Sequence, residues 1–295
     1  MASLKDIQRK IKSVKNTQKT TRAMKLVSSA KLKRTEELAR KSKVYAAKLT
    51  ELLSEIASKM ANANCDGIDL PYFKNAENPK TVDIVFVTAD KGLCGGFNSQ
   101  TIKRVNLLLK EHKEAGIESR LVAVGRKGVD YFRFNGVELE KSVIGLSAAP
   151  DFEKAAALIS EVAKNYLDGK TDKIILVHNG YVNMITQEVR QNQILPVDYS
   201  NLELNSVSTS ELAIEPDDNN ELLEALVKKY IEYTMYYALI DSLAAEHSAR
   251  MQAMDAATTN AKEMVKSLSV KYNKARQEAI TTELIEIISG MESMK

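Results

Sequence analysis

Cysteine and histidine are scarce in this sequence of 295 residues, and the few present show no spacing typical of a metal site. The two cysteines, Cys65 and Cys94, are too few for a disulfide framework, so we expect reduced thiols. The three histidines, His112, His178 and His247, are scattered along the chain. The sequence therefore predicts no metal site, zinc included.

Long apolar runs are also missing. No run approaches the roughly 20 residues of a membrane-spanning helix, although 44% of the residues are hydrophobic and 27% are charged. The N-terminus is charged from Lys5 onward and lacks the apolar core of a secretory leader, and no transit segment is evident. We therefore expect a soluble chain of the cytosolic type, with one large domain or two smaller ones.

Glycine and proline are almost absent from both ends of the chain. All five prolines and eleven of the twelve glycines lie between residues 67 and 216, and the exception is Gly290. Since these two residues break helices, their distribution predicts long helices at both ends. We expect an N-terminal coiled-coil helix over 1–66, an α/β domain over 67–216 and a C-terminal coiled-coil helix over 217–295.

Charge is divided along the same lines. The first segment carries a net charge of +10, the second −3 and the third −4. Between Lys5 and Lys43, 14 basic residues face only 3 acidic ones. Such a run is either a solvated helix face or a surface for an acidic partner, which would be nucleic acid or an acidic protein. The first aromatic residue is Tyr45, which argues against single-stranded nucleic acid but leaves duplex binding open.

The C-terminal segment has an apolar seam in alternating steps of three and four, a repeat typical of a coiled coil. Its members are Leu223, Leu226, Tyr230, Tyr233, Tyr237, Ile240, Ala244, His247, Met251, Met254, Thr258, Ala261, Val265, Leu268, Tyr272, Ala275 and Ala279. A helix over 218–290 would be about 110 Å long, so we expect much of it to project from a domain.

The N-terminal segment shows the same spacing in two stretches, and we expect a shift of register between them. The members are Leu4, Ile7, Ile11 and Val14, then Leu38, Ser42, Tyr45, Leu49, Leu52 and Ile56. Between the stretches the seam is polar or small, through Gln18, Thr21, Ser28, Ser29 and Ala30. Two helices that leave and re-enter one domain pair antiparallel, so the sequence predicts an antiparallel coiled coil.

The middle segment alternates between strand and helix patterns. We expect strands at Val82–Thr88, Arg120–Val124 and Ile174–His178, and an edge strand at Met184–Ile194. Helices are predicted at Ser99–Lys113, Lys127–Phe132 and Asp151–Leu167. This order predicts the α/β class, with a Rossmann-like, mainly parallel sheet and helices on both faces. Residues 200–217 read as a connection to the long helix.

A glycine-rich turn, from Asp90 to Asn98, follows the first predicted strand. Phosphates bind at this place in nucleotide-binding folds, but neither the dinucleotide nor the P-loop spacing is present. We therefore favour a tight structural turn over an anion site, and a structural Cys94 over a nucleophile. From the residues alone, a nucleotide-dependent enzyme and a duplex-binding coiled coil stay open as alternatives to a mechanical or scaffolding protein.

Both terminal segments and the glycine-rich turn resemble one known family. Residues 7–34 resemble the N-terminal helix, and residues 246–290 the C-terminal helix, of the gamma subunit of F-type ATP synthases. The turn from Lys91 to Gly96 is similar to the family's central motif, while the match over 115–215 is loose. Met291 follows Gly290 where the family usually has a small residue, and the cysteine-bearing insertion of the chloroplast form is missing.

The resemblance implies the central rotor shaft of a bacterial enzyme, turning inside a ring of three alpha and three beta subunits. Such a subunit couples proton flow to ATP synthesis and hydrolysis but has no catalytic, cofactor-binding or metal-binding residues of its own. The implied partners are the alpha, beta and epsilon subunits and the c-subunit ring, with one copy per complex and no nucleic acid. The implied location is peripheral, on the cytoplasmic face of the inner membrane.

The resemblance also implies which residues make the coupling contacts. These are Met24, Lys25, Arg250, Gln277, Thr281 and Glu283. Since Arg250 and Gln277 are not members of the predicted seam, we expect both side chains to face the surrounding ring.

Overall fold

The computed structural model describes residues 4–63, 70–74, 78–197 and 219–294. Its chain forms two compact units, one of residues 1–29 with 250–295 and the other of residues 30–249. The helices are α1 (Leu4–Ala63), α2 (Phe97–Glu114), α3 (Arg126–Phe134), α4 (Phe152–Leu167) and α5 (Asn219–Glu292), with a 3-10 turn at Pro71–Phe73. The strands are β1 (Thr81–Val87), β2 (Glu118–Val124), β3 (Lys141–Val143), β4 (Lys173–Tyr181) and β5 (Gln187–Leu195).

The strands of the larger unit form one sheet in the order β3-β2-β1-β4-β5. The first four strands are parallel, and β5 is an antiparallel edge strand paired with β4. This confirms the predicted α/β class and the mainly parallel sheet. β3 was not predicted, because three half-buried residues give no strand pattern, and β5 begins at Gln187, later than expected. Cys65 and the connection at 200–217 lie outside the described residues.

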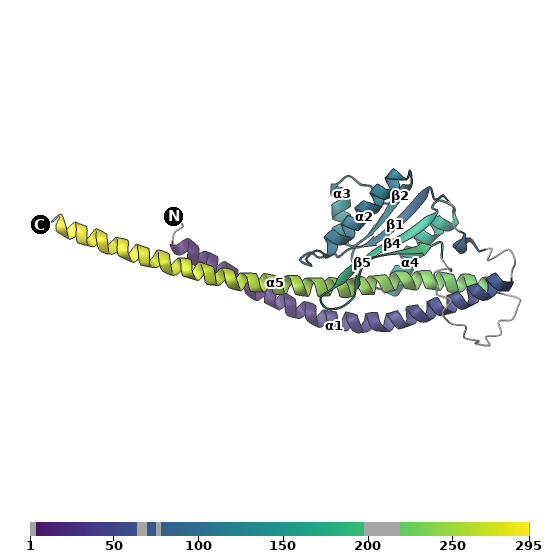
Figure 1. Cartoon of the computed structure of the whole chain (residues 1–295), viewed down its shortest axis with the longest axis horizontal. Coiled ribbons are helices and arrows are strands. Elements are labelled where there is room, and N and C mark those ends of the chain that lie inside the picture. Colours follow the sequence, from purple (N-terminus) through teal and green to yellow (C-terminus); the bar gives the residue numbers. More distant parts are fainter. Residues whose placement is uncertain (1–3, 64–69, 75–77, 198–218, 295) are drawn as a thin grey trace. The chain divides into compact units, whose positions relative to one another are not determined.

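Two apolar clusters cover the two faces of the sheet, because successive residues of β1 point to opposite sides. Ile84 and Phe86 pack with residues of α2 and α3. Val85 and Val87 pack with residues of α4 and α5 and with Leu53 of α1. Figure 1 shows the same arrangement, with α2 and α3 on one side of the sheet and α4 and α5 on the other. The larger unit is therefore a three-layer α/β body.

The ends of the helices in the larger unit follow local rules. Asp151 caps α4, because its Oδ1 accepts a hydrogen bond from the backbone N–H of Lys154 at 3.0 Å. Such a cap stabilises a helix by about 1 kcal/mol. Gly169 follows the C-terminus of the same helix with a φ of 71°, a conformation that costs glycine little. The predicted limits of α4, Asp151–Leu167, are therefore confirmed to within one residue.

In the smaller unit, α1 and α5 pair antiparallel. Thr21 Oγ1 lies 2.8 Å from Thr258 Oγ1, and Lys25 Nζ lies 2.6 Å from Asp255 Oδ1. The residue number rises on one helix as it falls on the other, which confirms the predicted antiparallel coiled coil. The predicted seam of α5 is also correct here, because each of its members from Met251 to Ala279 is buried or half-buried.

The predicted register shift in α1 is wrong. The buried and half-buried positions keep one alternating spacing, through Gln18, Thr21, Lys25 and Ser28 in the smaller unit, and through Leu32, Thr35, Ala39, Ser42, Ala46, Leu49 and Leu53 in the larger one. Leu38, Tyr45 and Leu52 are exposed, while their neighbours Ala39, Ala46 and Leu53 lie in the seam. The prediction placed the large apolar side chains in the seam. The seam instead contains the small residues Ala39 and Ala46, which allow the two helices to approach closely.

In the first part of α5, the members of the predicted seam from Leu223 to His247 are buried or half-buried as well, but the buried surface is wider than a heptad seam. Leu223, Val227, Ile231 and Met235 are almost fully buried, in steps of four. From Ala238 to Ala249 every residue is buried, so the helix has no exposed face there. The reason is that α5 packs against the α/β layers in this unit, as the shared apolar cluster shows, and a coiled-coil repeat assumes a single neighbouring helix.

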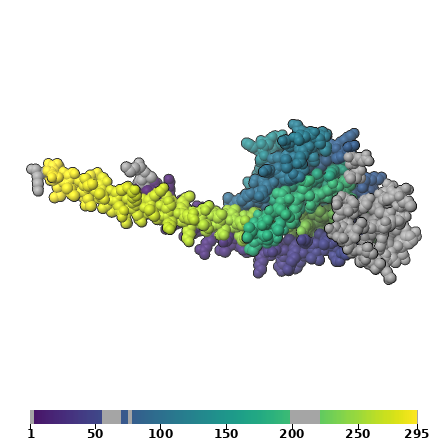
Figure 2. Space-filling model, viewed as in Figure 1, coloured from purple at the N-terminus to yellow at the C-terminus, as the bar shows by residue number. Residues whose placement is uncertain are grey.

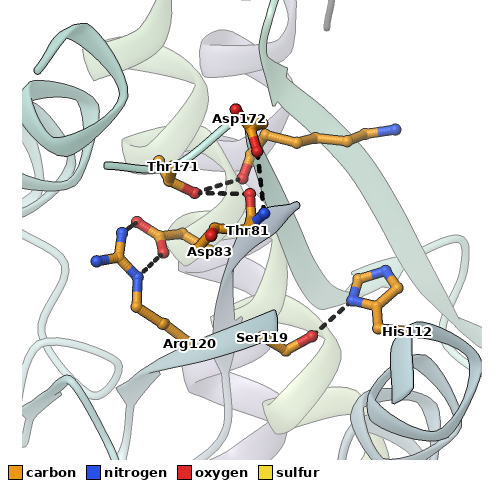
Figure 3. A network of polar contacts seen from close by, with 8 residues as sticks. Thr81, Asp83, His112, Ser119, Arg120, Thr171 and Asp172 are labelled. Carbon is orange, nitrogen blue, oxygen red and sulfur yellow. Dashed lines mark hydrogen bonds and ion pairs between the residues drawn. The ribbon is translucent and has the colours of Figure 1, made fainter. Parts of the chain in front are cut away.

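A network of polar contacts links the beginnings of β1, β2 and β4 (Figure 3). The Asp172 Oδ2 atom accepts hydrogen bonds from the backbone N–H groups of Lys80 and Thr81. Asp83, which is buried in β1, is paired with Arg120 through two contacts of 2.8 and 3.0 Å. Burial raises the pKa of the Asp83 carboxyl, and its hydrogen bonds and charge interaction with Arg120 oppose that rise. The pair therefore compensates a charge held inside the sheet.

His112 of α2 provides a pH test of this region. Its Nδ1 lies 2.7 Å from Ser119 Oγ, and burial lowers its pKa below the ordinary value of 6.5, with Glu111 opposing and Lys173 adding to the shift. The folded chain therefore binds this proton less readily than the unfolded chain, so its stability contribution is present above pH 6.5 and is lost as the pH falls. We expect His112→Asn to lose less stability than the original chain between pH 7.5 and 5.0, measured as the shift in urea midpoint. Equal losses would contradict this assignment.

Candidate functional site

The glycine-rich turn lies at the carboxyl end of β1, where nucleotide-binding folds hold a phosphate. In this chain the place is taken by the side chain of Asp90. Its Oδ1 accepts the backbone N–H of Arg126, the first residue of α3, at 2.9 Å. Its Oδ2 accepts the N–H of Gly145 and the hydroxyl of Ser147, both at 3.0 Å. A carboxylate of the chain therefore takes three donors near this turn, among them the first backbone N–H of α3.

The rest of the turn has a structural role. Cys94 is buried, and its Sγ accepts a hydrogen bond from Asn98 Nδ2 at 3.2 Å. The same Asn98 side chain accepts the N–H of Ala89 at 2.9 Å, which closes the turn on itself. Ala89, Cys94 and Phe97 form a small apolar cluster with residues of α5. The expectation of a tight turn with a structural thiol is therefore supported.

We expect the purified chain neither to bind nor to hydrolyse ATP, because Asp90 occupies the donors at the start of α3 and would repel a phosphate. Isothermal titration with ATP and Mg²⁺ should give no saturable heat up to millimolar concentration. Asp90→Asn removes the repulsion and serves as the matched variant. Micromolar affinity of the unmodified chain would contradict the assignment.

The coupling residues implied by the resemblance fall into two groups on the smaller unit. Met24 is half-buried in α1, and its neighbour Lys25 forms the ion pair with Asp255. Gln277 and Thr281 are exposed on α5 and joined by a 2.9 Å hydrogen bond from Thr281 Oγ1 to the Gln277 carbonyl oxygen. At 1.5 Å per residue, about 33 Å of helix separates Asp255 from Gln277, so the structure does not unite them in one constellation.

Gln277 and Thr281 border a shallow recess of about 400 Å³, with Lys274, Glu278 and Thr282. Glu283 is exposed but lies two residues beyond Thr281, which turns its side chain to another side of the helix. Gln277 is exposed, as expected for a residue outside the seam, and its contact with a surrounding ring stays a prediction.

The expectation for Arg250 is wrong. Its side chain belongs to the buried stretch of α5 and is only 8% exposed. Its position one residue before Met251 suggested an outward direction, because the heptad pattern assigns exposure from one neighbouring helix alone. Arg250 therefore offers no open surface in this chain.

The smaller unit carries an excess of positive charge on one helix. Between Lys5 and Lys25, α1 has eight basic residues and one acidic residue, and all of them except Lys25 are exposed. The part of α5 in this unit has equal numbers of acidic and basic residues over 250–294. Such a surface attracts an acidic partner and would be screened by salt.

The end of α5 presents large apolar side chains to solvent. They include Ile280, Leu284, Ile285, Ile287, Ile288, Met291 and Met294, each at least half exposed. Figure 2 shows this part of the helix, in yellow, without cover from other described residues on the face in view. A run of this size on a monomer is typical of a surface that binds another protein.

The described residues contain no group of three or more acidic, cysteine or histidine side chains placed to hold a metal ion. None of their helices has the length and apolarity needed to cross a bilayer.

Comparisons with known proteins identify the relatives of this chain. A family model described as "ATP synthase" matches residues 3–294. The ATP synthase gamma chain of Sulfurovum sp. is 71% identical over 295 residues, and that of Nitratiruptor sp. is 61% identical, each match covering both chains completely.

Solved structures show the same fold. The first is the central stalk and c-ring of the Tetrahymena thermophila mitochondrial ATP synthase, with a TM-score of 0.63 and 26% identity over 81% of this chain and 99% of that one. The second is from the Euglena gracilis mitochondrial ATP synthase, with a TM-score of 0.66 and 18% identity over 99% and 94%. At that identity, the second match shows likeness of fold alone.

Proposed function

This chain belongs to the family of ATP synthase gamma chains, and we propose that it couples proton flow to ATP synthesis and hydrolysis by rotating as the central stalk of an F-type enzyme. The observation that carries the proposal is the full-length match at 71% identity to a bacterial gamma chain. The subunit is non-catalytic, because the chemistry of the complex takes place in its beta subunits. Its site is therefore a set of partner surfaces.

The smaller unit is the part that we assign to the ring of alpha and beta subunits. Its exposed basic face on α1 suits acidic groups of the surrounding ring. The apolar end of α5 suits an apolar inner surface of that ring. Within it we assign coupling contacts to Met24, Lys25, Gln277, Thr281 and Glu283. Arg250 is assigned an indirect role, because its side chain is buried.

The α/β unit is the part that we assign to the epsilon subunit and the c-subunit ring. The solved relative titled as a central stalk with its c-ring supports the second of these partners. We also propose one copy per complex, no nucleic acid partner, and a peripheral position on the cytoplasmic face of a bacterial inner membrane. The division of the chain into 1–66, 67–216 and 217–295 stays a prediction.

Purification of the native complex tests the proposal. An affinity tag inserted beside Gly136, an exposed turn with no atom within 4 Å of an added Cβ, leaves both helix ends free. We expect alpha and beta subunits to co-purify at three copies each per copy of this chain, together with epsilon and c subunits. The absence of alpha and beta, or a second copy of this chain, would overturn it. A duplex-binding protein would instead bring DNA into the preparation.

A further inference from the structure

One carboxylate of α5, that of Asp241, is buried inside the α/β unit and fastens two strands to the helix. Its side chain is 4% exposed. Its Oδ1 accepts the backbone N–H of Tyr181 in β4 at 3.1 Å. Its Oδ2 lies 2.7 Å from Nη1 of Arg190 in β5 and 3.3 Å from Nε2 of His178 in β4. Three groups from the β4–β5 hairpin therefore converge on one side chain of the long helix.

A second fastening lies two helical turns further along α5. The Ser248 hydroxyl donates to the carbonyl oxygen of Met184, in the turn between β4 and β5, at 2.9 Å. The same hydroxyl accepts a hydrogen bond from Gln187 Nε2 at 2.8 Å. Since seven residues separate Asp241 from Ser248, both lie on the same side of α5, about 10 Å apart along its axis.

Small apolar residues of α5 lie beside these two points. Ala245 and Ala249 pack with Cys94 and Phe97 of the glycine-rich turn and with Tyr181. Small side chains allow a close approach, but apolar packing alone has little directional preference and permits sliding. Hydrogen bonds and ion pairs restrict both distance and angle, and a buried carboxylate is costly to leave unpaired. The polar contacts are therefore the part of the junction that fixes its geometry.

We propose that Asp241 is the positioning residue that holds the α/β unit rigidly on α5. Torque applied to this unit is then transmitted to the helix without relative movement of the two. The inference rests on the proposed function, since only a rotor subunit must carry torque through this junction. Arg190 is held in place by Glu188 as well, through a 3.0 Å contact to its Nε. Ser248 is the second anchor, and two anchors about 10 Å apart along α5 prevent the hairpin from pivoting about either one of them.

The structure offers a matched control. Asp83 is another buried aspartate of the same unit, and it is also paired with an arginine, Arg120. Its hydrogen bonds with Arg120 join β1 to β2 within the sheet network of Figure 3. Asp241→Asn and Asp83→Asn both remove a buried negative charge without changing side-chain size. Loss of stability is common to both, whereas loss of stiffness at the junction is expected for Asp241→Asn alone.

The experiment measures torsional stiffness in the assembled complex. The ring is fixed to a surface, a bead is attached to the α/β unit through a peptide inserted beside Gly136, and the angular variance of the bead is recorded with catalysis stalled. We expect at least a twofold larger variance for Asp241→Asn and no change for Asp83→Asn. Ser248→Ala, which keeps the small buried side chain, should also raise the variance and serves if Asp241→Asn does not assemble.

The outcomes separate the two proposals. A bead on the unmodified complex that does not rotate when ATP is added contradicts the rotor function itself. Rotation together with an unchanged variance in Asp241→Asn and Ser248→Ala overturns the role of the junction alone. An equal rise in Asp83→Asn would also overturn it, because the effect would then follow from general loosening of the α/β unit.

Discussion

Gly125→Ala is expected to prevent stable folding of the α/β unit. Gly125 has a φ of 102° and a ψ of 137°, a conformation that residues with a Cβ rarely adopt. An added Cβ would lie 2.0 Å from the carbonyl oxygen of Thr88, which is backbone and has no rotamer to change. The Gly125 N–H is also bonded to the Val143 carbonyl oxygen at 2.8 Å, so the loop is held from the other side. We expect a loss of more than about 4 kcal/mol, close to the whole stability of many domains.

Gly136→Ala is the control for this substitution. Gly136 also has a positive φ, 70°, but no atom lies within 4 Å of the added Cβ. It should therefore cost only the backbone strain, about 1 to 2 kcal/mol. Urea unfolding followed by circular dichroism measures both. Similar midpoints for the two variants would show that the contact with Thr88 can be relieved, and would contradict the prediction.

Arg250→Ala is expected to give the largest loss of coupling among the shaft residues. Truncating a buried arginine removes packing and leaves the groups around it without their partner. Arg250 is buried and interacts with another residue, so both the yield of complex and ATP-driven proton pumping should fall. We expect pumping in membrane vesicles, per assembled complex, to drop about tenfold. Arg250→Lys, which keeps the charge, should lose less.

Gln277→Leu is the companion substitution at an exposed position. Changes at exposed helix positions usually alter stability by less than about 0.5 kcal/mol, so assembly should be normal. Any fall in pumping would then come from a lost contact to the ring, and it should be smaller than that of Arg250→Ala. Normal pumping by Gln277→Leu would remove this residue from the coupling contacts.

Helix breakers and alternating patterns predicted most of the fold. The absence of glycine and proline from residues 1–66 predicted α1, and the apolar runs at Val82–Thr88 and Ile174–His178 predicted the two central strands. β3 was missed because three residues paired at the end of a sheet have no period of their own. β3 forms because it pairs with β2, and the three residues of β3 do not by themselves indicate that partner.

The site was less predictable because burial in a helix depends on how many neighbours it has. The spacing in α5 predicted exposure correctly for Gln277, where one helix is the neighbour, and incorrectly for Arg250, which lies in a stretch that is buried on all sides. Asp241 was not recognised, since a lone aspartate in a helix pattern gives no sign of the strands that bind it. Its three partners come from a hairpin more than 50 residues away in sequence.

The carboxylate of Asp90 bears on whether ATP, which the complex makes and hydrolyses, can bind to this chain. A sheet of this type offers a place where nucleotides commonly settle, and a rotor works beside sites that bind and release ATP in every cycle. Asp90 instead takes the backbone donors of Arg126 and Gly145 for the chain itself. We therefore expect the stability of this unit to be the same with and without ATP.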